Sequence, residues 1–333
     1  MSETETSSNT NKSTELYKQQ RFFFMALDPI HIGTGGYRLG RVDMTIAREP
    51  GTNLPKIPGT SLAGAARAYA AMSYGKPEAA GQHKKYLESL KKAGKKASDC
   101  AILYTFGTAT DNDAGQAGTV SIGDARILFF PVASQQGPVW VSTPEILREA
   151  CGYTLPAGIV PTDTQVVTNL TVTSLNLGWL LLSASPQPLF TLSAPQDLIN
   201  KDEWKAIKER LVLVTPKVFS QVVNSNLEVR TSVSIDPDTG AASEGALFTY
   251  EALPRATWLW CDVIQDDYNK EFPNPVDNMT VKLGHTTPLD VVGSGFKLME
   301  YLGVGGMGTR GFGRIKVVAS PIIVQEVLHE RAG

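Results

Sequence analysis

The chain has 333 residues, of which 42% are hydrophobic and 19% charged, and its 31 Lys plus Arg against 33 Asp plus Glu give a formal net charge of −2. This composition excludes a disordered, collagen-like or coiled-coil protein and allows a large buried core. The near-neutral charge argues against a protein that holds nucleic acid by net charge alone, but it leaves room for a local basic groove.

The cysteines and the N-terminus indicate the compartment. Cys100, Cys151 and Cys261 are far apart and odd in number, which predicts no disulfide framework and fits a reducing environment. Residues 1–17 are rich in Ser, Thr, Asn and Glu and lack the apolar stretch of a signal peptide, so we expect a disordered tail. Apolar runs elsewhere are too short to span a membrane. We therefore expect a cytoplasmic protein with no membrane partner.

The N-terminal part alternates predicted strands with one clear helix. Residues 21–27 (RFFFMAL) form a short continuous apolar run, which predicts a buried strand. After a glycine-rich loop at 31–36, apolar and polar residues alternate over 42–46 and predict a second short strand. A turn at 56–61 then leads into a helix, for which its Thr or Ser is the expected cap. Apolar residues at helical spacing over 62–69 define the buried face of that helix.

The middle of the chain contains a helical insertion, further strands and a helix that leads into a strand. Residues 84–96 (KKYLESLKKAGKK) predict a basic helix within an insertion at about 70–115; such a run is usually a solvated face, and RNA contact is the alternative. The pattern returns to strands over 120–141, and 204–214 predicts an amphipathic helix that feeds a strand. Because no linker is visible, we expect a single domain over residues 18–333.

A long β-hairpin is predicted at about 226–252. Residues 227–235 (LEVRTSVSI) alternate between apolar and polar, 236–240 (DPDTG) have strong turn chemistry, and 246–250 supply a return strand. We expect its exposed face to be polar, as in an arm that reaches away from the body.

A second glycine-rich segment lies near the C-terminus, at 303–314 (GVGGMGTRGFGR). It formally contains the GxGxxG of dinucleotide-binding folds, but a strand follows it instead of a helix, so we reject that interpretation. Such a loop can expose backbone N–H groups to a phosphodiester backbone, with Arg310 and Arg314 adding charge and Phe312 a flat apolar surface. A tight turn between packed elements explains the glycines equally well.

Two residues near the first glycine-rich loop are candidates for chemistry. The four histidines have neither metal-site nor triad spacing, and His31, at the edge of this loop, is at least as typical of a structural residue as of a catalytic one. Asp43 follows an arginine-containing stretch and is typically an ion-paired residue there. With an ordinary pKa of about 3.9, it is too weak a base for efficient proton abstraction. In chemistry it would bind a divalent ion or orient a hydroxyl.

Several blocks of this sequence resemble a known family. Residues 29–35, 42–49 and 57–67 are similar to the N-terminal signature of RAMP proteins from type III CRISPR effector complexes, and the C-terminal glycine cluster resembles their glycine-rich loop. Residues 121–144 and 230–254 resemble the repeated backbone subunit of the Cmr (type III-B) complex. The backbone subunit of the Csm complex is similar at both ends of the chain but is usually shorter.

The resemblance implies an α+β fold: a RAMP-type, ferredoxin-like (RRM-related) core with insertions and a protruding thumb β-hairpin. It also implies several copies stacked along a CRISPR RNA, with other Cmr-type subunits, that cleave complementary target RNA at regular intervals. In the family, the Asp of the Gly-x-Val-Asp loop is needed for cutting. This role maps onto Asp43, as catalytic residue and ligand of Mg²⁺ or Mn²⁺, with His31 as a helper.

The glycine loops, the adjoining cations and the hairpin supply the predicted RNA contacts. These are Thr34, Arg38, Arg41, Ser61, Arg67, Arg230, Thr231, Gly306, Thr309, Arg310, Phe312 and Arg314. The chain departs from its relatives at Ala63, where they commonly carry a lysine. Guide contact at that helix must therefore depend on its N-terminal N–H groups, Ser61 and Arg67.

Two other functions stay open. One is a structural RNA-binding filament subunit that does not cut, against which the retention of Asp43 argues. The other is an endonuclease that processes CRISPR RNA precursors by itself and without metal. The cutting hypothesis requires the two glycine-lined surfaces, from opposite ends of the chain, to meet beside Asp43.

Overall fold

The structure is a computed structural model that describes residues 17–35, 42–81, 83–108, 115–186, 201–242, 247–266, 271–273 and 277–323. The main sheet contains β1 (Lys18–Ala26), β2 (Lys56–Ile57), β3 (Val120–Ile122), β4 (Ala125–Val132), β5 (Val139–Ser142), β6 (Gln165–Thr168), β7 (Ser174–Leu177), β8 (Leu180–Pro186), β9 (Leu211–Leu213), β12 (Trp258–Gln265) and β13 (Ile315–Ile323). A second sheet pairs β10 (Glu228–Ser232) with β11 (Phe248–Ala252). The α-helices are α1 (Gly59–Ser73), α2 (His83–Lys92), α3 (Ala101–Phe106), α4 (Pro144–Cys151), α5 (Lys201–Glu209), α6 (Pro216–Ser225), α7 (Asn278–Leu283) and α8 (Pro288–Leu302).

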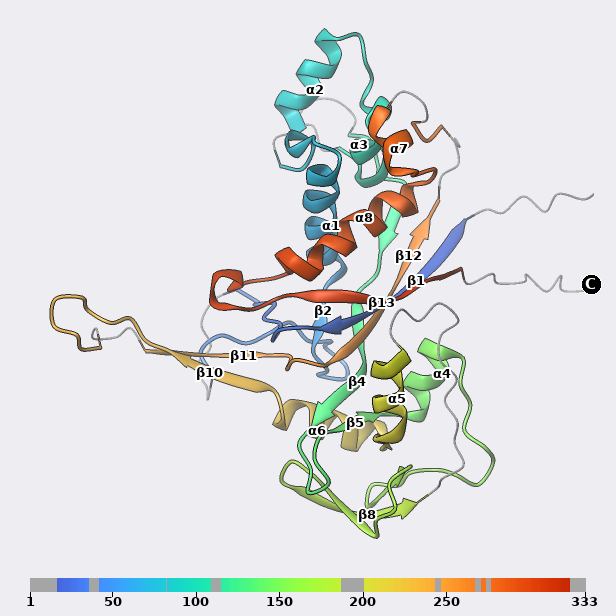
Figure 1. Ribbon diagram of the computed structural model, residues 1–333, viewed down its shortest axis with the longest axis vertical. Helices are drawn as coiled ribbons and strands as arrows, with labels where there is room; N and C mark the ends of the chain where they lie inside the picture. Colours follow the sequence, from blue (N-terminus) through green and yellow to red (C-terminus); the bar gives the residue numbers. More distant parts are fainter. Residues whose placement is uncertain are drawn as a thin grey trace, which may run out of the picture.

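The centre of the molecule is a ferredoxin-like unit. In chain order it reads β1, α1, β4, β12, α8 and β13, and in the sheet its strands lie in the order β13-β1-β12-β4 with antiparallel neighbours. Phe24 in β1 is opposite Leu259 of β12 on one side and Val317 of β13 on the other. Helices α1 and α8 lie together beside this sheet (Figure 1). The ferredoxin-like core implied by the sequence is therefore confirmed.

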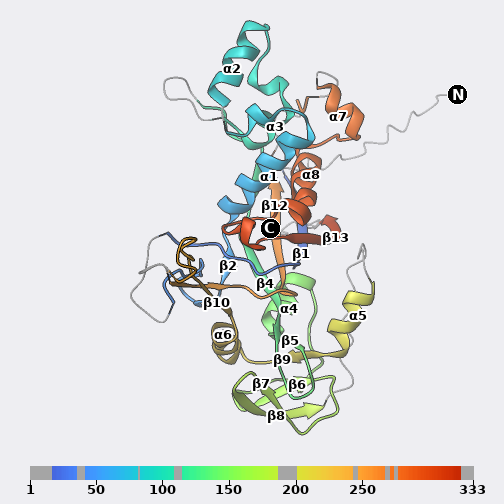
Figure 2. The same ribbon diagram turned by 60° about the vertical axis from the view of Figure 1, so that its left-hand side comes forward.

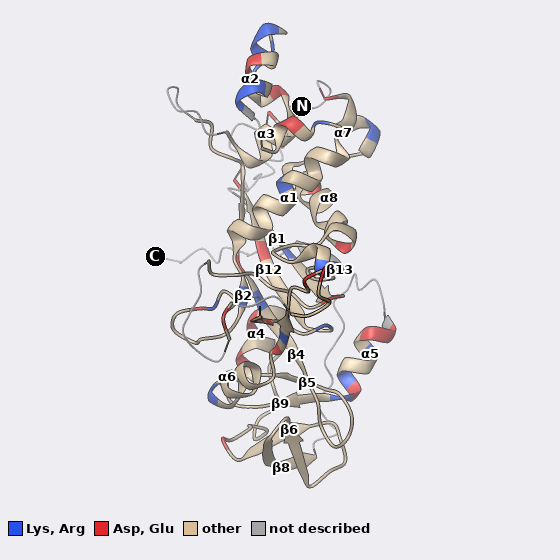
Figure 3. Ribbon diagram, turned by 90° about the vertical axis from the view of Figure 1, so that its left-hand side faces the viewer, with Lys and Arg blue, Asp and Glu red and all other residues tan. Residues whose placement is uncertain are grey.

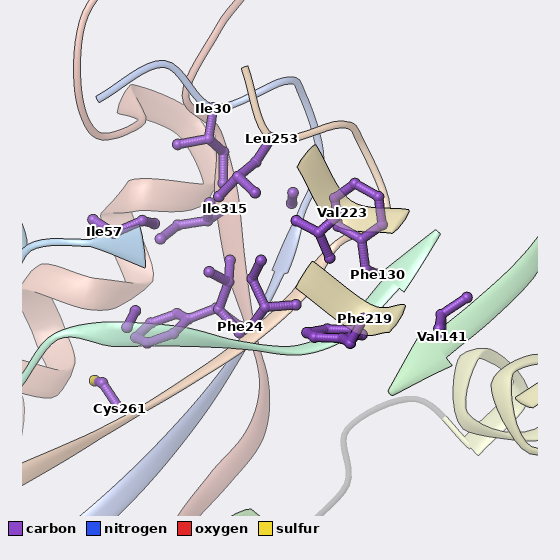
Figure 4. Packing of buried hydrophobic residues seen from close by; sticks show 14 of the residues in the cluster. Phe24, Ile30, Ile57, Phe130, Val141, Phe219, Val223, Leu253, Cys261 and Ile315 are labelled. Carbon is purple, nitrogen blue, oxygen red and sulfur yellow. The ribbon is translucent and has the colours of Figure 1, made fainter. Parts of the chain in front are cut away.

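The second half of β1 is apolar because both of its faces are covered there. Phe22 and Phe24 point toward α8 and meet Phe296 edge-to-face, with ring centroids 4.9 and 5.1 Å apart. Phe23 points to the opposite face and belongs to a separate apolar cluster. The first cluster continues to Phe219 and Val223 of α6, which lie near Phe130 in Figure 4.

The sheet face opposite α1 and α8 is covered by protein. Leu147 and Ala150 of α4 and Trp204 of α5 pack on it, and Trp204 contacts Phe129 and Trp258 with centroids 5.8 and 5.9 Å away. RRM domains use this face to stack bases on exposed aromatic side chains. Here those aromatics are core residues, so RNA has to bind elsewhere on the molecule.

Beyond β4 the sheet continues as β5-β9-β6-β8-β7, with parallel pairing between β5 and β9 and between β6 and β8. This part forms the lower end of the molecule in Figures 1 and 2. Helix α5 leads directly into β9, as the pattern over 204–214 predicts.

The helical insertion between α1 and β3 has its own small core, with Tyr74, Tyr104 and Leu103 fully buried. Helix α2 ends at Lys92 because Gly94 adopts a left-handed backbone (φ +69°). Its lysines lie at one end of the long axis, away from β10 and β11 (Figures 1 and 3). No described helix is long and apolar enough to cross a membrane.

Some sequence expectations were wrong. Residues 42–46 form no strand: Met44, Ile46 and Arg48 each make an isolated bridge with a different partner segment. Helix α1 begins after Pro58 with no side-chain cap. Helices α4, α6 and α8 had no predicted counterpart.

Strands β10 and β11 form the arm, which protrudes from the body in Figure 1. The ladder runs from Glu228 opposite Ala252 to Ser232 opposite Phe248, and the predicted turn follows, with Gly240 at φ +67°. The hairpin itself is thus confirmed. Its expected polar exposure is wrong, because large apolar side chains are exposed on it: Val229, Val233, Ile235 and Leu247.

Candidate functional site

The two glycine-rich loops meet. The N–H of Gly306 donates to the carbonyl of His31 (2.9 Å), and the N–H of Gly313 donates to that of Pro29 (2.9 Å). The C-terminal loop follows α8 and precedes β13, so it connects the helix that packs on β1 with the strand that pairs with β1. The convergence that the cutting hypothesis requires is present, although these two N–H groups are used inside the protein and are not offered to phosphate.

Close backbone approach explains why the C-terminal loop needs glycine at 305. Gly305 has φ +89°, and a Cβ there would overlap the Ile32 side chain and lie 2.6 Å from the carbonyl oxygen of His31. Its neighbour Gly306 has ordinary van der Waals room, with the nearest His31 atoms 3.6 and 3.7 Å from a built Cβ.

Substituting these neighbouring glycines should therefore have unequal effects. Gly305→Ala is expected to lower the free energy of unfolding by about 2 kcal/mol or more, because it adds backbone strain to a steric overlap. Gly306→Ala should change it by less than about 0.5 kcal/mol. Urea denaturation of the two variants measures this difference. Equal stabilities of the two variants would show that the close contact between Gly305 and the first glycine loop does not stabilise the protein.

His31 has a structural role. Its side chain is 2% exposed, and its Nδ1–H donates to the carbonyl of Glu251 (2.7 Å). The ring also lies edge-on to Tyr250 and within 3.2 Å of a Cβ built on Gly33. These contacts lock the first glycine loop onto β11. The helper role expected for His31 is not supported, because the ring is enclosed by protein.

Asp43 lies beside β11 at the base of the arm. One of its carboxylate oxygens, Oδ2, accepts hydrogen bonds from both the N–H (2.7 Å) and the hydroxyl (2.9 Å) of Thr249. The Asp43 N–H in turn donates to Thr249 Oγ1 (3.1 Å). The next residue, Met44, bridges Tyr250, which keeps the segment parallel to β11. Asp43 is half-buried, so the carboxylate is oriented by protein and still reachable.

The backbone and side-chain hydrogen bonds from Thr249 lower the pKa of Asp43 below its ordinary value. The carboxylate is consequently ionised at neutral pH and is a weak base there. No described cation forms an ion pair with it. Its chemistry is that of a fixed anion that binds a cation or accepts a hydrogen bond from a hydroxyl.

Two of the predicted arginines lie over aromatic rings, one in the arm and one in the C-terminal glycine loop. The Arg230 guanidinium lies 4.7 Å from the centroid of the Phe312 ring, and that of Arg310 lies 5.1 Å from the centroid of Phe248. Phe312 itself is only 2% exposed and packs with Tyr250, so its predicted stacking on RNA is wrong. The ring instead supports Arg230, which also pairs with a Glu on the same strand.

The remaining predicted residues of the loops differ in whether their side chains are exposed or already paired within the protein. Thr34 is exposed and contacts Thr45 through their hydroxyls (3.3 Å). Thr231 and Thr309 are exposed as well. Arg314 forms a bidentate pair with Asp28 (2.6 and 3.1 Å), which raises the pKa of the arginine and neutralises much of its charge. Arg38 and Arg41 lie outside the described residues.

The predicted contacts on α1 belong to the protein interior. Both Nε and Nη2 of Arg67 donate to the carbonyl of Ala79 (3.1 and 3.0 Å), and burial lowers the pKa of this arginine. At the start of α1, the N–H of Gly59 donates to the carboxylate of Asp124 (2.7 Å). Ser61, in the same turn, is half-buried. An acidic side chain thus occupies the position expected for a phosphate, so the structure does not support guide binding there.

A buried ion pair holds the Asp43 segment from its other end. Arg48 and Glu251 form two parallel contacts (2.6 and 2.9 Å), and Glu251 also accepts the N–H of Ile46 (2.9 Å). The two partners are 203 residues apart. Arg48 and Glu251 each lie in a block that resembles the family, but neither block shows that the two residues pair. Sequence reasoning had no signal with which to find this pair, or to find Thr249.

The described residues form no cluster of three His, Cys, Asp or Glu side chains that would hold a metal by themselves. Mg²⁺, however, is commonly bound by one or two carboxylates together with substrate phosphates and water. Asp43 fits that type of site, in which the RNA supplies the other ligands.

Comparison with known proteins identifies relatives of this chain. The chain is 27% identical over 311 residues to a Pyrococcus furiosus protein named CRISPR system Cmr endoribonuclease Cmr4, with 89% of this chain and 94% of that protein aligned. In fold it resembles a crystal structure of oligomeric Cmr4 from the same organism (TM-score 0.54, 20% identity, 92% and 98% covered). It is also similar to a chain in a cryo-EM structure of the type III-B Cmr-beta bound to cognate target RNA (TM-score 0.58, 14% identity, 90% and 96% covered). A model of the RAMP superfamily matches residues 23–316, and the chain belongs to that superfamily.

Proposed function

We propose that this protein is a backbone subunit of a type III-B CRISPR effector complex. Copies of it bind a CRISPR RNA side by side, associate with other Cmr-type subunits, and cut complementary target RNA at regular intervals. The observation that carries the proposal is the position of Asp43: an ionised carboxylate tied to the base of the arm, beside the junction of the two glycine loops. The alignment with a protein named a Cmr endoribonuclease over most of both chains supports it.

The arm suits the insertion of protein into a nucleic-acid duplex. Its Val229, Val233, Ile235 and Leu247 are exposed, and apolar side chains of this kind wedge between stacked bases in other nucleic-acid complexes. A wedge next to Asp43 would displace one nucleotide of the target from the duplex. This displacement would bring the 2′-hydroxyl of the ribose into line with the neighbouring phosphate, close to the carboxylate.

The cations of the arm and of the C-terminal glycine loop have a matching role. Arg310 and Arg230 are held over aromatic rings on the side of the arm that faces the C-terminal glycine loop. They would hold the backbone phosphates of the RNA while base pairing with the guide selects the target. Binding would therefore be independent of target sequence on the protein side.

A divalent cation belongs to this proposal. Asp43 would hold Mg²⁺ or Mn²⁺ jointly with the RNA, and the ion would neutralise charge that develops on the cleaved phosphate. The chain itself contributes the orientation of the carboxylate and the cationic side chains around it.

Metal removal gives a direct test. Excess EDTA is expected to reduce target cutting by a reconstituted complex at least about 100-fold while the complex remains assembled, because the ion would contribute several kcal/mol of charge stabilisation. Added Mg²⁺ or Mn²⁺ should restore cutting. Metal analysis of the dialysed free protein should find no stoichiometric divalent ion, because a single carboxylate binds it weakly. Cutting that is unchanged in EDTA would contradict the metal assignment.

The function as a whole is tested with purified subunits, a guide RNA and labelled target RNAs. We expect cuts at regular spacing in a complementary target and none in a target of scrambled sequence. The free protein should leave a precursor of the CRISPR RNA intact. A complex that binds complementary target but never cuts it would identify the chain as a scaffold.

A further inference from the structure

Three hydrogen bonds join Thr249 to Asp43. Its N–H and its hydroxyl both donate to Oδ2, and the same hydroxyl oxygen accepts the Asp43 N–H. A hydroxyl can donate to the carboxylate and accept from the backbone N–H through the same oxygen atom. Valine has the shape of threonine and can do neither.

These contacts restrict the carboxylate. An Asp on a surface segment ordinarily samples several rotamers, whereas two donors on one oxygen fix the plane of the carboxylate and leave Oδ1 for a ligand. Thr249 is β-branched and lies in a strand, so its own χ1 is restricted and its hydroxyl is placed without much loss of entropy.

Thr249 also belongs to the arm. It lies in β11 directly opposite Thr231 of β10, and its carbonyl accepts the N–H of Met44 (3.0 Å). Two residues further along, Glu251 accepts the N–H of Ile46 and pairs with Arg48. The Asp43 segment is therefore attached to β11 over its whole length, and a displacement of the arm moves the carboxylate with it.

We propose that Thr249 is the positioning residue for Asp43, setting the orientation of its carboxylate for cleavage and linking that orientation to the seating of the arm. This inference depends on the proposed ribonuclease function. It assigns no contact between Thr249 and the RNA, because the hydroxyl is already used by Asp43.

The test compares Thr249→Val and Thr249→Ser in the reconstituted complex. Single-turnover cutting at saturating target should fall about 10- to 100-fold in Thr249→Val, since a catalytic group that is misplaced by about 1 Å loses activity of this order. The dissociation constant for target RNA should stay within about 2-fold of the parent, because the binding cations are unchanged. Thr249→Ser keeps the hydroxyl and should cut within about 3-fold of the parent.

A second readout separates positioning from general damage to the fold. The hydroxyl of Thr249 helps to lower the pKa of Asp43, so Thr249→Val should raise that pKa. The acidic limb of the rate–pH profile should then move to higher pH in Thr249→Val and remain in place in Thr249→Ser. A purely structural defect would lower the rate without moving the limb.

Thr164→Val is a matched control, because Thr164 is exposed and its hydroxyl contacts only that of Thr162 among the residues that the structure describes. This variant should cut like the parent. Parent-like rates and pH profile in Thr249→Val, or equal losses in Thr249→Val and Thr249→Ser, would overturn the positioning role while the parent still cuts. A parent complex that does not cut, or cutting that persists in Asp43→Asn, would instead overturn the ribonuclease function and this inference with it.

Discussion

Asp43→Ala is expected to lower the rate of target cutting by about 100-fold or more in a reconstituted complex, in line with the loss of a group that acts directly on the reacting atoms. The carboxylate is the ionised group at the base of the arm, and its Oδ2 is already engaged by Thr249. The variant leaves the Thr249 N–H and hydroxyl exposed to water, so we expect little change in the fold. Single-turnover kinetics at saturating target measure the effect on the chemical step.

Asp43→Asn is the sharper variant, because its side-chain oxygen can still accept from Thr249 while the charge is removed. It should assemble and bind target like the parent and cut as poorly as Asp43→Ala. Electrophoretic analysis of the complex and target-binding titrations provide the controls. Cutting at a parent-like rate by assembled Asp43→Asn would place the active site elsewhere.

The largest effect on stability is expected at Glu251. Glu251→Ala should lower the free energy of unfolding by about 3 kcal/mol, because it leaves the Arg48 guanidinium partly buried without its partner and also frees the N–H of Ile46. The Glu251 side chain is only 9% exposed, so water cannot replace the lost contacts well. Urea denaturation of the free protein measures the change.

An exposed ion pair serves as the comparison for this prediction. Lys217 and Asp163 are 2.9 Å apart, but their side chains are 71% and 49% exposed, so Lys217→Ala should cost less than about 1 kcal/mol. Cutting by assembled Glu251→Ala should also decrease, because the Asp43 segment loses its second attachment to β11. Equal stabilities of the two variants would mean that the Arg48–Glu251 pair does not hold this segment.

The elements that sequence reasoning identified are those whose pattern is local. The apolar run of β1, the helical spacing of α1, and the alternation and turn of the arm each depend on residues close together in the chain, and the structure confirms them. Sequence reasoning missed helices α4, α6 and α8, although each begins with a capping Thr followed by Pro, which is a local signal. The 42–46 segment has strand-like alternation but no single partner strand, and therefore forms isolated bridges.

Some features of the candidate site also follow from the local sequence, and others depend on the tertiary structure. The sequence by itself determined which residue types were available: an Asp after a glycine loop, a second glycine-rich loop with arginines, and a hairpin. Only the tertiary structure decided that His31 and Phe312 are buried, that Arg67 donates to a backbone carbonyl, and that Thr249 holds Asp43. The physical reason is that burial and long-range hydrogen bonds arise between residues up to two hundred positions apart, where neither periodicity nor spacing carries information.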